Sequence, residues 1–255
     1  MGKLDNKVAI VTGSASGMGK AMAKLYASEG AKVLLADFNV DGAKTVSDAI
    51  NQGGGTTHAL KVDVSNAEDI INMFDKAVDL FGKVDIMVNN AGIMDGFEPV
   101  GEISDERWDK IFDVNTKGVM RAMRKAVNYW VDNGMKGTII NTISTGGLNG
   151  AHAGVAYGAS KHAVTALTKN SAFMYAEKSI RINGIAPGAV ETNIGASMTS
   201  MSEFGFSRAK LTHDLSPRTG QPEEIGQVAV FLASDDSSFV NGAIIIADGG
   251  WTSGF

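Results

Sequence analysis

The chain has 255 residues, of which 44% are hydrophobic and 20% charged, with a net charge of −5 and no cysteine. This composition is typical of a globular protein with a sizeable core, and we expect one domain over residues 1–255. The acidic balance argues against a nucleic-acid partner, and the lack of cysteine excludes disulfides and thiolate metal sites.

The first seven residues are polar and lead directly into an apolar strand. Neither a signal peptide nor an apolar run of about 18 residues is present. We therefore expect a cytoplasmic protein with no membrane partner.

Short β-branched runs alternate with amphipathic stretches along the chain. The expected strands are Val8–Thr12, Lys32–Ala36, Ala59–Val62, Ile86–Asn89, Thr138–Ile143, Arg181–Ile185 and Ala243–Ala247, and the expected helices cover residues 18–29, 40–51, 66–81, 104–132, 155–178 and 222–233. Strands with little polar alternation, separated by helices, predict an α/β fold: a doubly wound, seven-stranded parallel sheet flanked by helices.

A glycine-rich turn follows the first strand in the run Thr12–Gly19, with the spacing Gly-x-x-x-Gly-x-Gly. Glycines permit a sharp turn and a close approach of the backbone to a pyrophosphate, and the next helix offers unpaired N–H groups. A glycine-rich turn without a ligand remains the alternative. The expected cofactor contacts in this turn are Gly13, Ser16, Gly17, Met18 and Gly19.

Two aspartates follow the second and third strands. Asp37 lies 18 residues after Gly19, where a carboxylate accepts hydrogen bonds from adenosine ribose hydroxyls and repels a 2′-phosphate. No arginine follows Asp37 in the next two positions, so the sequence favours NAD over NADP. Asp63 and the adjacent Val64 are expected to hold the adenine edge, although a turn-forming Asp63 is an equally good interpretation.

Tyr157 and Lys161 lie four residues apart in an expected helix, with Ser144 thirteen residues before Tyr157. Positions i and i+4 share a helix face, so the ammonium stands beside the phenol. A free tyrosine has a pKa of about 10. A neighbouring positive charge lowers that pKa and makes the phenol a usable acid–base catalyst, although such a pair alone is weak evidence.

Residues 189–215 break the strand–helix alternation. Met198, Met201, Phe204 and Phe206 lie there among Ser, Thr and Gly, and Gly195 and Gly205 are expected to interrupt any helix. We expect a mobile substrate lid with an apolar underside, and a continuous core helix is the alternative.

Together these segments resemble the short-chain dehydrogenase/reductase family in its single-domain form, over nearly the whole chain. The motifs that carry the resemblance are the Thr12–Gly19 turn, Asn89-Asn90-Ala91-Gly92, Val114-Asn115-Thr116, Ser144, Tyr157 with Lys161, Pro187-Gly188 with Thr192, and Asp248-Gly249-Gly250. The resemblance implies a Rossmann fold and a homotetramer.

The family also implies roles for individual residues. Tyr157 would be the general acid–base, Ser144 would bind the substrate oxygen, and Lys161 would lower the pKa of Tyr157 and bind the nicotinamide ribose. Asn115 would hold a water that links Lys161 to solvent. The resemblance adds Asn90, Ala91, Gly92, Tyr157, Lys161, Pro187, Gly188 and Thr192 to the cofactor contacts, although Asn90 could be purely structural.

We therefore interpret the chain as an NAD-dependent oxidoreductase that interconverts a secondary alcohol and a ketone, with a small to medium, partly apolar substrate. A 3-oxoacyl-thioester reductase that uses NADPH is the first alternative, supported by Arg121 and Arg124, and a non-catalytic dinucleotide sensor is the second. The four histidines lack metal-ligand spacing, so no metal is expected. His152 either lines the substrate pocket or lies behind it, and the apolar tail Trp251–Phe255 packs on its own core or on another subunit.

Overall fold

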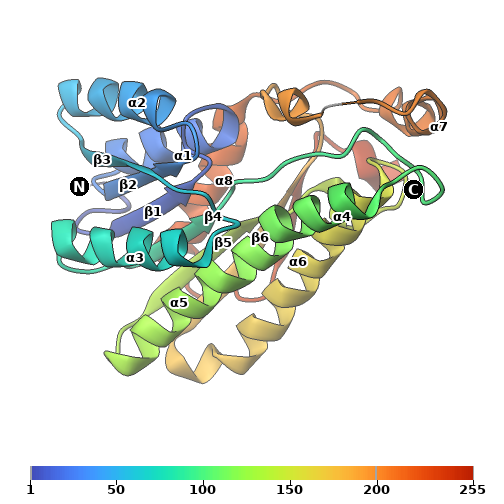
Figure 1. Ribbon diagram of the computed structural model, residues 1–255. Coiled ribbons are helices and arrows are strands. Elements are labelled where there is room, and N and C mark those ends of the chain that lie inside the picture. Colours follow the sequence, from blue (N-terminus) through green and yellow to red (C-terminus); the bar gives the residue numbers. More distant parts are fainter. Residues whose placement is uncertain (1, 199, 255) are drawn as a thin grey trace.

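The computed structural model describes residues 2–198 and 200–254. The described residues form a seven-stranded sheet in the order β3-β2-β1-β4-β5-β6-β7, and every pairing is parallel (Figure 1). The strands are β1 Val8–Thr12, β2 Lys32–Asp37, β3 Thr56–Lys61, β4 Ile86–Asn89, β5 Gly137–Thr142, β6 Ile180–Pro187 and β7 Ile244–Ala247. The strand order reverses between β1 and β4, so the expected doubly wound Rossmann-like sheet is confirmed.

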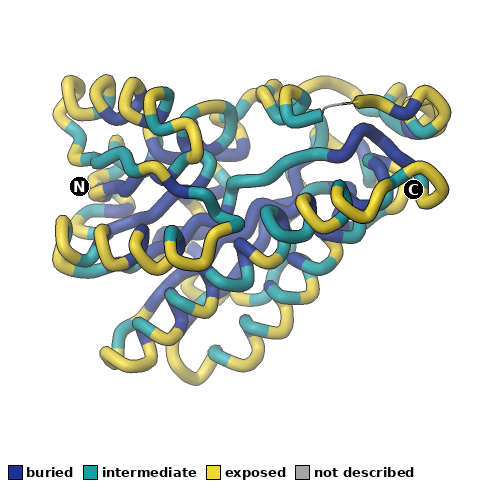
Figure 2. The backbone as a smooth tube through the Cα atoms, viewed as in Figure 1, coloured by how far each residue is buried: buried dark blue, intermediate teal, exposed yellow. Residues whose placement is uncertain are grey.

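Helices cover both faces of the sheet (Figure 1). One face carries α1 Gly17–Ser28, α2 Val40–Gln52 and α8 Pro222–Ala233, and the other carries α3 Ala67–Phe81, α5 Val119–Asp132 and α6 Val155–Met174. Each face has its own apolar cluster, and β1, β4 and β5 between them are buried (Figure 2). Burial on both faces explains why these strands lack polar alternation. Among the described residues, no helix is both long and apolar enough to cross a membrane.

The third strand differs from its expected bounds of Ala59–Val62, because it begins at Thr56. It is an edge strand, and its first residues are polar. The Thr57 N–H donates to Asn51 Oδ1 at 2.8 Å, and the Thr57 hydroxyl lies 2.7 Å from that of Ser47. The start of this strand is therefore held by side-chain hydrogen bonds to α2. It lacks the apolar run that marks the buried strands in the sequence.

The helix expected over 104–132 is divided into three parts. α4 spans Asp105–Phe112, a π-helical turn spans Asp113–Gly118, and α5 follows. The wider π turn places Asn115 against Ile93, whose backbone N–H and C=O both bond to the Asn115 side chain at 2.9 Å. π turns inside helices occur often at functional sites.

The predicted lid contains two short helical segments, a 3₁₀ turn at Ile194–Ser197 and the helix α7 Glu203–His213. Thr199 lies outside the described residues. The expectation that Gly205 interrupts a helix is wrong, because Gly205 lies in the first turn of α7. A Cβ at this position would lie 1.8 Å from the Phe97 carbonyl oxygen, so glycine permits close packing of α7. The underside is apolar only in part: Phe206 packs on Phe97, whereas Met201 and Phe204 are exposed.

The close packing of β5 on α5 provides a test of this fold. A Cβ at Gly137 would lie 2.1 Å from the Trp130 ring, which is fully buried and held by a 2.6 Å hydrogen bond from Nε1 to the Val84 carbonyl. We expect Gly137→Ala to lower the free energy of unfolding by about 1–3 kcal/mol through overpacking. Urea denaturation measures the loss. Gly101→Ala, at an exposed glycine with open space around it, is the control and should be neutral; equal stabilities of the two variants would contradict the packing.

Candidate active site

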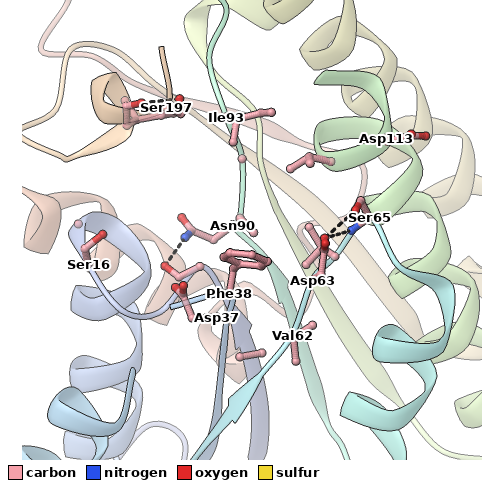
Figure 3. Close-up of a pocket in the computed structure, with 18 of the residues that line it drawn as sticks. Ser16, Asp37, Phe38, Val62, Asp63, Ser65, Asn90, Ile93, Asp113 and Ser197 are labelled. Carbon is pink, nitrogen blue, oxygen red and sulfur yellow. Dashed lines mark hydrogen bonds between the residues drawn. The ribbon is translucent and has the colours of Figure 1, made fainter. Parts of the chain in front are cut away.

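A cavity of about 760 Å³ opens at the carboxyl ends of β1 to β4 (Figure 3). In doubly wound sheets, ligands bind at this edge beside the reversal in strand order. Eleven of the expected cofactor residues line it: Gly13, Ser16, Gly17, Met18, Asp37, Asp63, Val64, Asn90, Ala91, Gly92 and Thr192. The structure thus brings together residues from five separate segments of the sequence.

The glycine-rich turn forms one wall of the cavity. Gly13 and Gly17 have φ values of 67° and 52°, in the left-handed region that favours glycine. Gly19 does not line the cavity. A Cβ there would lie 2.0 Å from the Gly13 carbonyl oxygen, so Gly19 lets α1 pack against the turn. The first residues of α1 therefore line the cavity beside a turn that carries few side chains. The unpaired N–H groups at such a helix N-terminus bind an anion well.

Asp37 ends β2 and is fixed by two backbone donors. Its Oδ2 accepts from Ala15 N and its Oδ1 from Asn39 N, both at 2.8 Å. Each carboxylate oxygen keeps a lone pair for a further donor. In Figure 3, Asp37 and Asp63 lie on either side of the exposed Phe38 ring at the ends of neighbouring strands.

Asp63 combines the two interpretations that the sequence left open. Its Oδ1 accepts from Ser65 N at 2.9 Å and from the Ser65 hydroxyl at 2.6 Å, which makes it a turn-forming aspartate. Asp63 and Val64 also line the cavity. Asn90 is similar: its side-chain amide donates to the Thr12 and Gly13 carbonyls at 3.0 and 3.2 Å, so it holds the glycine-rich turn while lining the cavity.

Tyr157 lies in the first turn of α6, with 7% of its surface exposed. A side-chain hydrogen bond links it to Ser144, which follows β5. Burial raises the pKa of Tyr157 to about 12, and the Ser144 hydrogen bond acts in the opposite direction. The cost of burying a phenolate dominates, so the pKa of Tyr157 in the protein alone lies above its ordinary value, and the lowering expected from Lys161 stays a prediction.

Lys161 lies one turn further along α6 and is also buried. Its Nζ donates to the Thr142 carbonyl at 2.9 Å and lies 5.7 Å from the centre of the Tyr157 ring. Burial lowers the pKa of Lys161 to about 8. The amine is therefore held beside the phenol as expected, but in a setting that penalises its charge.

Gly92 joins the cavity to these buried groups. A Cβ at Gly92 would lie 3.3 Å from Asn115 Oδ1 and 3.5 Å from Lys161 Nζ. Asn115 also donates to the Ser160 hydroxyl at 3.2 Å. Asn115 and Lys161 thus lie behind the Gly92 wall, and Tyr157 lies one helical turn before Lys161 with Ser144 as its partner. The water relay assigned to Asn115 stays a prediction.

The remaining expected cofactor residues divide into two cases. Thr192 lines the cavity and lies against the glycine-rich turn, with its methyl carbon 3.1 Å from the position of a Cβ on Gly17. Pro187 ends β6, and Gly188 packs on Asp248, where a Cβ would lie 2.7 Å from the Asp248 Cβ. These last two residues lie outside the lining of the cavity.

Sequence reasoning missed the buried Asp95, whose carboxylate bonds to the start of α6. No spacing rule identifies it, because Asp95 and α6 are about 60 positions apart and meet only in the fold. It also missed the acidic side chains Glu106, Asp109 and Asp113, which line the cavity from α4 and the π turn.

An aromatic cluster lies behind the lid. His152 is buried and stacks on Trp251 with ring centres 4.1 Å apart, while His213 of α7 contacts both rings edge-on. Trp251 Nε1 donates to the Thr212 carbonyl at 2.7 Å. Trp251 therefore packs on its own chain, the first of the two alternatives, whereas Phe255 lies outside the described residues.

Comparisons with known proteins agree with this geometry. A family model described as enoyl-(acyl carrier protein) reductase matches residues 13–252. The 3β-hydroxysteroid dehydrogenase 2 of Eggerthella lenta is 45% identical, covering 98% of this chain and 96% of that protein. The cyclohexanol dehydrogenase of an Acinetobacter species is 40% identical, covering 98% and 97%.

Solved structures are similar along the whole chain. Levodione reductase superimposes with a TM-score of 0.90 at 33% identity, covering 99% of this chain and 100% of that one. A structure from Agrobacterium tumefaciens, described as a candidate 2-deoxy-D-gluconate 3-dehydrogenase with bound NADP, has a TM-score of 0.85 at 33% identity, with 98% of both chains covered.

The buried amine predicts a pH-dependent stability. Because the pKa of Lys161 is about 8 in the folded protein and about 10.4 in an unfolded chain, the unfolded state binds more protons between these values. The free energy of unfolding should therefore rise with pH over this window. Lys161→Met should abolish this rise, which we expect to exceed about 1 kcal/mol.

Urea denaturation at pH values below and above the pKa of about 8 measures the effect. Lys169→Met, at an exposed position of the same helix, is the matched control and should leave the pH dependence as in the wild type. Parallel pH profiles for the wild type and Lys161→Met would show that the amine is not held in a buried site.

Proposed function

Because the chain belongs to the short-chain dehydrogenase/reductase family, we propose that it interconverts a secondary alcohol and a ketone, with NAD as cofactor and Tyr157 as general acid–base. The observation that carries the proposal is the meeting of Ser144, Tyr157 and Lys161, with the Lys161 amine directly behind the Gly92 wall of the cavity. The chain is an oxidoreductase of this family. The proposal concerns the reaction between alcohol and ketone, the choice of NAD and the role of Tyr157.

The residues of the cavity fit a dinucleotide. The glycine-rich turn and the N-terminus of α1 present backbone N–H groups for a pyrophosphate, and Asp37 presents carboxylate oxygens for a ribose. Val64 and Asp63 stand at the end of β3 for an adenine, while Gly92 lies beside the Lys161 amine and Thr192 lies against the glycine-rich turn. When bound, the nicotinamide supplies hydride transfer to or from the substrate carbon.

The side chains of this protein supply proton transfer and orientation. The Ser144 hydroxyl and the Tyr157 phenol both reach the oxygen of a substrate held between them, and the phenol donates its proton to that oxygen in ketone reduction. In alcohol oxidation, Tyr157 accepts the proton. Lys161 places a positive charge beside the phenol, which favours the phenolate that oxidation requires.

The choice of NAD rests on charge. The cavity lining contains the carboxylates of Asp37, Asp63, Glu106, Asp109 and Asp113 and the single ammonium of Lys110. A 2′-phosphate would add negative charge beside Asp37, which costs binding energy. The similar structure crystallised with NADP shows that this fold can hold NADP, so the proposal of NAD rests on the charge around Asp37.

We propose an alicyclic secondary alcohol as the substrate class. The two relatives named above are dehydrogenases of a 3β-hydroxysteroid and of cyclohexanol. In both of these substrates the hydroxyl is attached to a saturated ring. A 3-oxoacyl-thioester reductase that uses NADPH is less well supported. Arg121, which kept that alternative open, donates to the Ser65 carbonyl at 2.6 Å and so holds the loop after β3.

A homotetramer is the proposed assembly. Trp108 and Phe112 stack at 4.7 Å and line an apolar groove between α4, α5 and α6, together with Met120, Ala163, Ala166 and Leu167. Apolar grooves along paired helices are suited to contact with a second copy across a two-fold axis. Sedimentation of the purified chain would measure the assembly.

Replacing the phenol tests the reaction itself. We expect the wild type to oxidise cyclic secondary alcohols with NAD, followed by the absorbance of the reduced cofactor. Tyr157→Phe removes the proton carrier and should lower kcat by about 10²–10⁴-fold while NAD binding, measured by calorimetry, stays within a few-fold. Tyr129→Phe, on α5, is the control. Turnover by Tyr157→Phe at the wild-type rate would remove Tyr157 from its role, and a wild type that binds NAD without any turnover would favour the sensor.

A second substitution tests the cofactor. Asp37→Ser removes the carboxylate beside the ribose, so the ratio of kcat/KM for NAD to that for NADP should fall at least about tenfold, or ~1.4 kcal/mol. Steady-state kinetics with each cofactor measure the ratio. Asp41→Ser, at a largely exposed aspartate of α2, is the control. An unchanged ratio in Asp37→Ser would mean that another group selects the dinucleotide.

A further inference from the structure

The segment of residues 93–98, which we call the connecting segment, follows β4 and contacts three parts of the molecule. At its beginning, Ile93 bonds to Asn115 of the π turn. At its end, the Glu98 carbonyl accepts from Val155 N at 2.9 Å, at the start of α6. The lid residue Ser202 donates from its backbone N–H to the Gly96 carbonyl at 2.8 Å. The segment therefore lies between the lid and the helix that carries Tyr157.

Asp95, at the centre of this segment, is completely buried. Its Oδ2 accepts from Tyr157 N at 2.8 Å, and its Oδ1 accepts from Gly154 N at 3.0 Å and from Phe97 N at 3.2 Å. Burial and the neighbouring Glu98 raise the pKa of Asp95 above its ordinary value, and the three N–H donors act against them by stabilising the charged form. A buried carboxylate is costly, so such an arrangement persists only where its hydrogen bonds hold the structure around it.

Asp95 caps the N-terminus of α6, which has no capping side chain of its own. The N-cap residue of α6 is Gly154, which has no side chain to accept from the first N–H groups of the helix. A Cβ at Gly154 would lie 2.4 Å from Asp95 Oδ1, so the glycine makes room for the carboxylate. The cap of the Tyr157 helix is therefore supplied by the connecting segment.

The lid is packed on the same segment at very short range. A Cβ on Gly96 would lie 2.0 Å from the Ser200 carbonyl oxygen, and one on Gly205 would lie 1.8 Å from that of Phe97. Phe97 has a φ of 60°, a strained value for a residue with a side chain, and its N–H is held by Asp95. The conformation on which the lid rests is thus fixed by the carboxylate that caps α6.

We propose that Asp95 is a positioning residue of the acid–base centre: it ties the backbone of Tyr157 to the segment beneath the lid and holds a negative charge near the phenol. The inference rests on the proposed acid–base role of Tyr157. Asp95 acts through Tyr157 and through the lid, and not by contact with the substrate.

The charges around the phenol agree with this role. The Asp95 carboxylate raises the pKa of Tyr157, the Ser144 hydrogen bond lowers it, and Lys161 stands on the same helix. Glu98 faces Asp95 but is paired with Arg107 of α4 at 3.3 Å. On the lid side, His213 of α7 packs on Phe97, and His152 packs edge-on against His213. Asp95 is therefore the carboxylate whose removal should change the titration of Tyr157.

The test compares Asp95→Asn with the wild type. An amide replaces one carboxylate oxygen by an NH₂ group, which must face a backbone N–H, and it removes the charge. We expect Tyr157 to ionise about one pH unit lower, the effect of one nearby charge. The phenolate is measured by its near-ultraviolet absorbance as the difference from Tyr157→Phe, over the pH range in which circular dichroism shows an intact fold. The pH midpoint of alcohol oxidation should move in the same direction, and the plateau kcat should fall about 10–100-fold because the phenol is displaced.

Two further variants separate positioning from general stability. Asp85→Asn is the matched control, since Asp85 also accepts a hydrogen bond from a backbone N–H, that of Val8 at 2.8 Å. Asp85 lies at the amino end of β4, opposite the end at which the cavity opens. Asp85→Asn should lower the melting temperature and leave the titration and its midpoint unchanged. Asp95→Glu keeps the charge but moves the carboxylate, so the titration should stay near that of the wild type while kcat falls at least tenfold.

The outcomes are distinct. A lower melting temperature of Asp95→Asn with an unchanged phenolate titration and an unchanged pH midpoint would overturn the proposal. If Asp95→Asn does not fold, Asp95→Glu decides: a wild-type kcat would overturn the proposal, and a reduced kcat with an unchanged titration would support it. If the wild type turns over no alcohol, the proposed function fails, and the phenolate titration of Asp95→Asn still decides whether Asp95 acts on Tyr157.

Discussion

The structure depends on placing a phenol and an amine together in a space that excludes water. The Tyr157 and Lys161 side chains lie within one turn of α6 with almost no exposed surface, and the Lys161 ammonium is partnered by the Thr142 carbonyl. Burial moves their pKa values in opposite directions, to about 12 for the tyrosine and about 8 for the lysine, because in both cases the charged form loses its hydration. Hydrogen bonds, nearby charges and the packing of α6 then determine where the proton resides.

The parallel sheet supplies the geometry that brings these groups to a ligand. The carboxyl ends of its strands meet at one edge, so Asp37 after β2, Gly92 after β4 and Ser144 after β5 converge although more than 50 residues separate each from the next along the chain. Glycines then remove the side chains that would block the approach. Gly19 allows α1 to touch its own turn, and Gly92 leaves a single backbone thickness between the cavity and the buried Lys161 and Asn115. The site is therefore an outcome of close backbone packing on two faces of the sheet.

Local patterns predicted much of this arrangement. The apolar strands, the glycine-rich turn and the i, i+4 relation of Tyr157 and Lys161 are set by short-range sequence, and the fold places them as expected. The direction of the Tyr157 pKa could not be predicted, because it depends on burial by residues distant in the chain. Gly205 was misread for a similar reason: its role comes from the Phe97 carbonyl, which reaches it across more than 100 positions. Asp95 left no signal, since helix capping is normally sought within the helix's own sequence, and here the acceptor comes from another segment.

The balance of charges around Tyr157 also bears on the direction of proton transfer. Burial and the Asp95 carboxylate both favour the protonated phenol, and the Ser144 hydrogen bond acts against them. In the proposed role of Tyr157, the protein by itself therefore holds the proton that ketone reduction needs, and alcohol oxidation requires an additional influence that stabilises the phenolate. A positive charge is the strongest such influence, and Lys161 carries one, although its own pKa of about 8 means that this charge is lost at mildly alkaline pH.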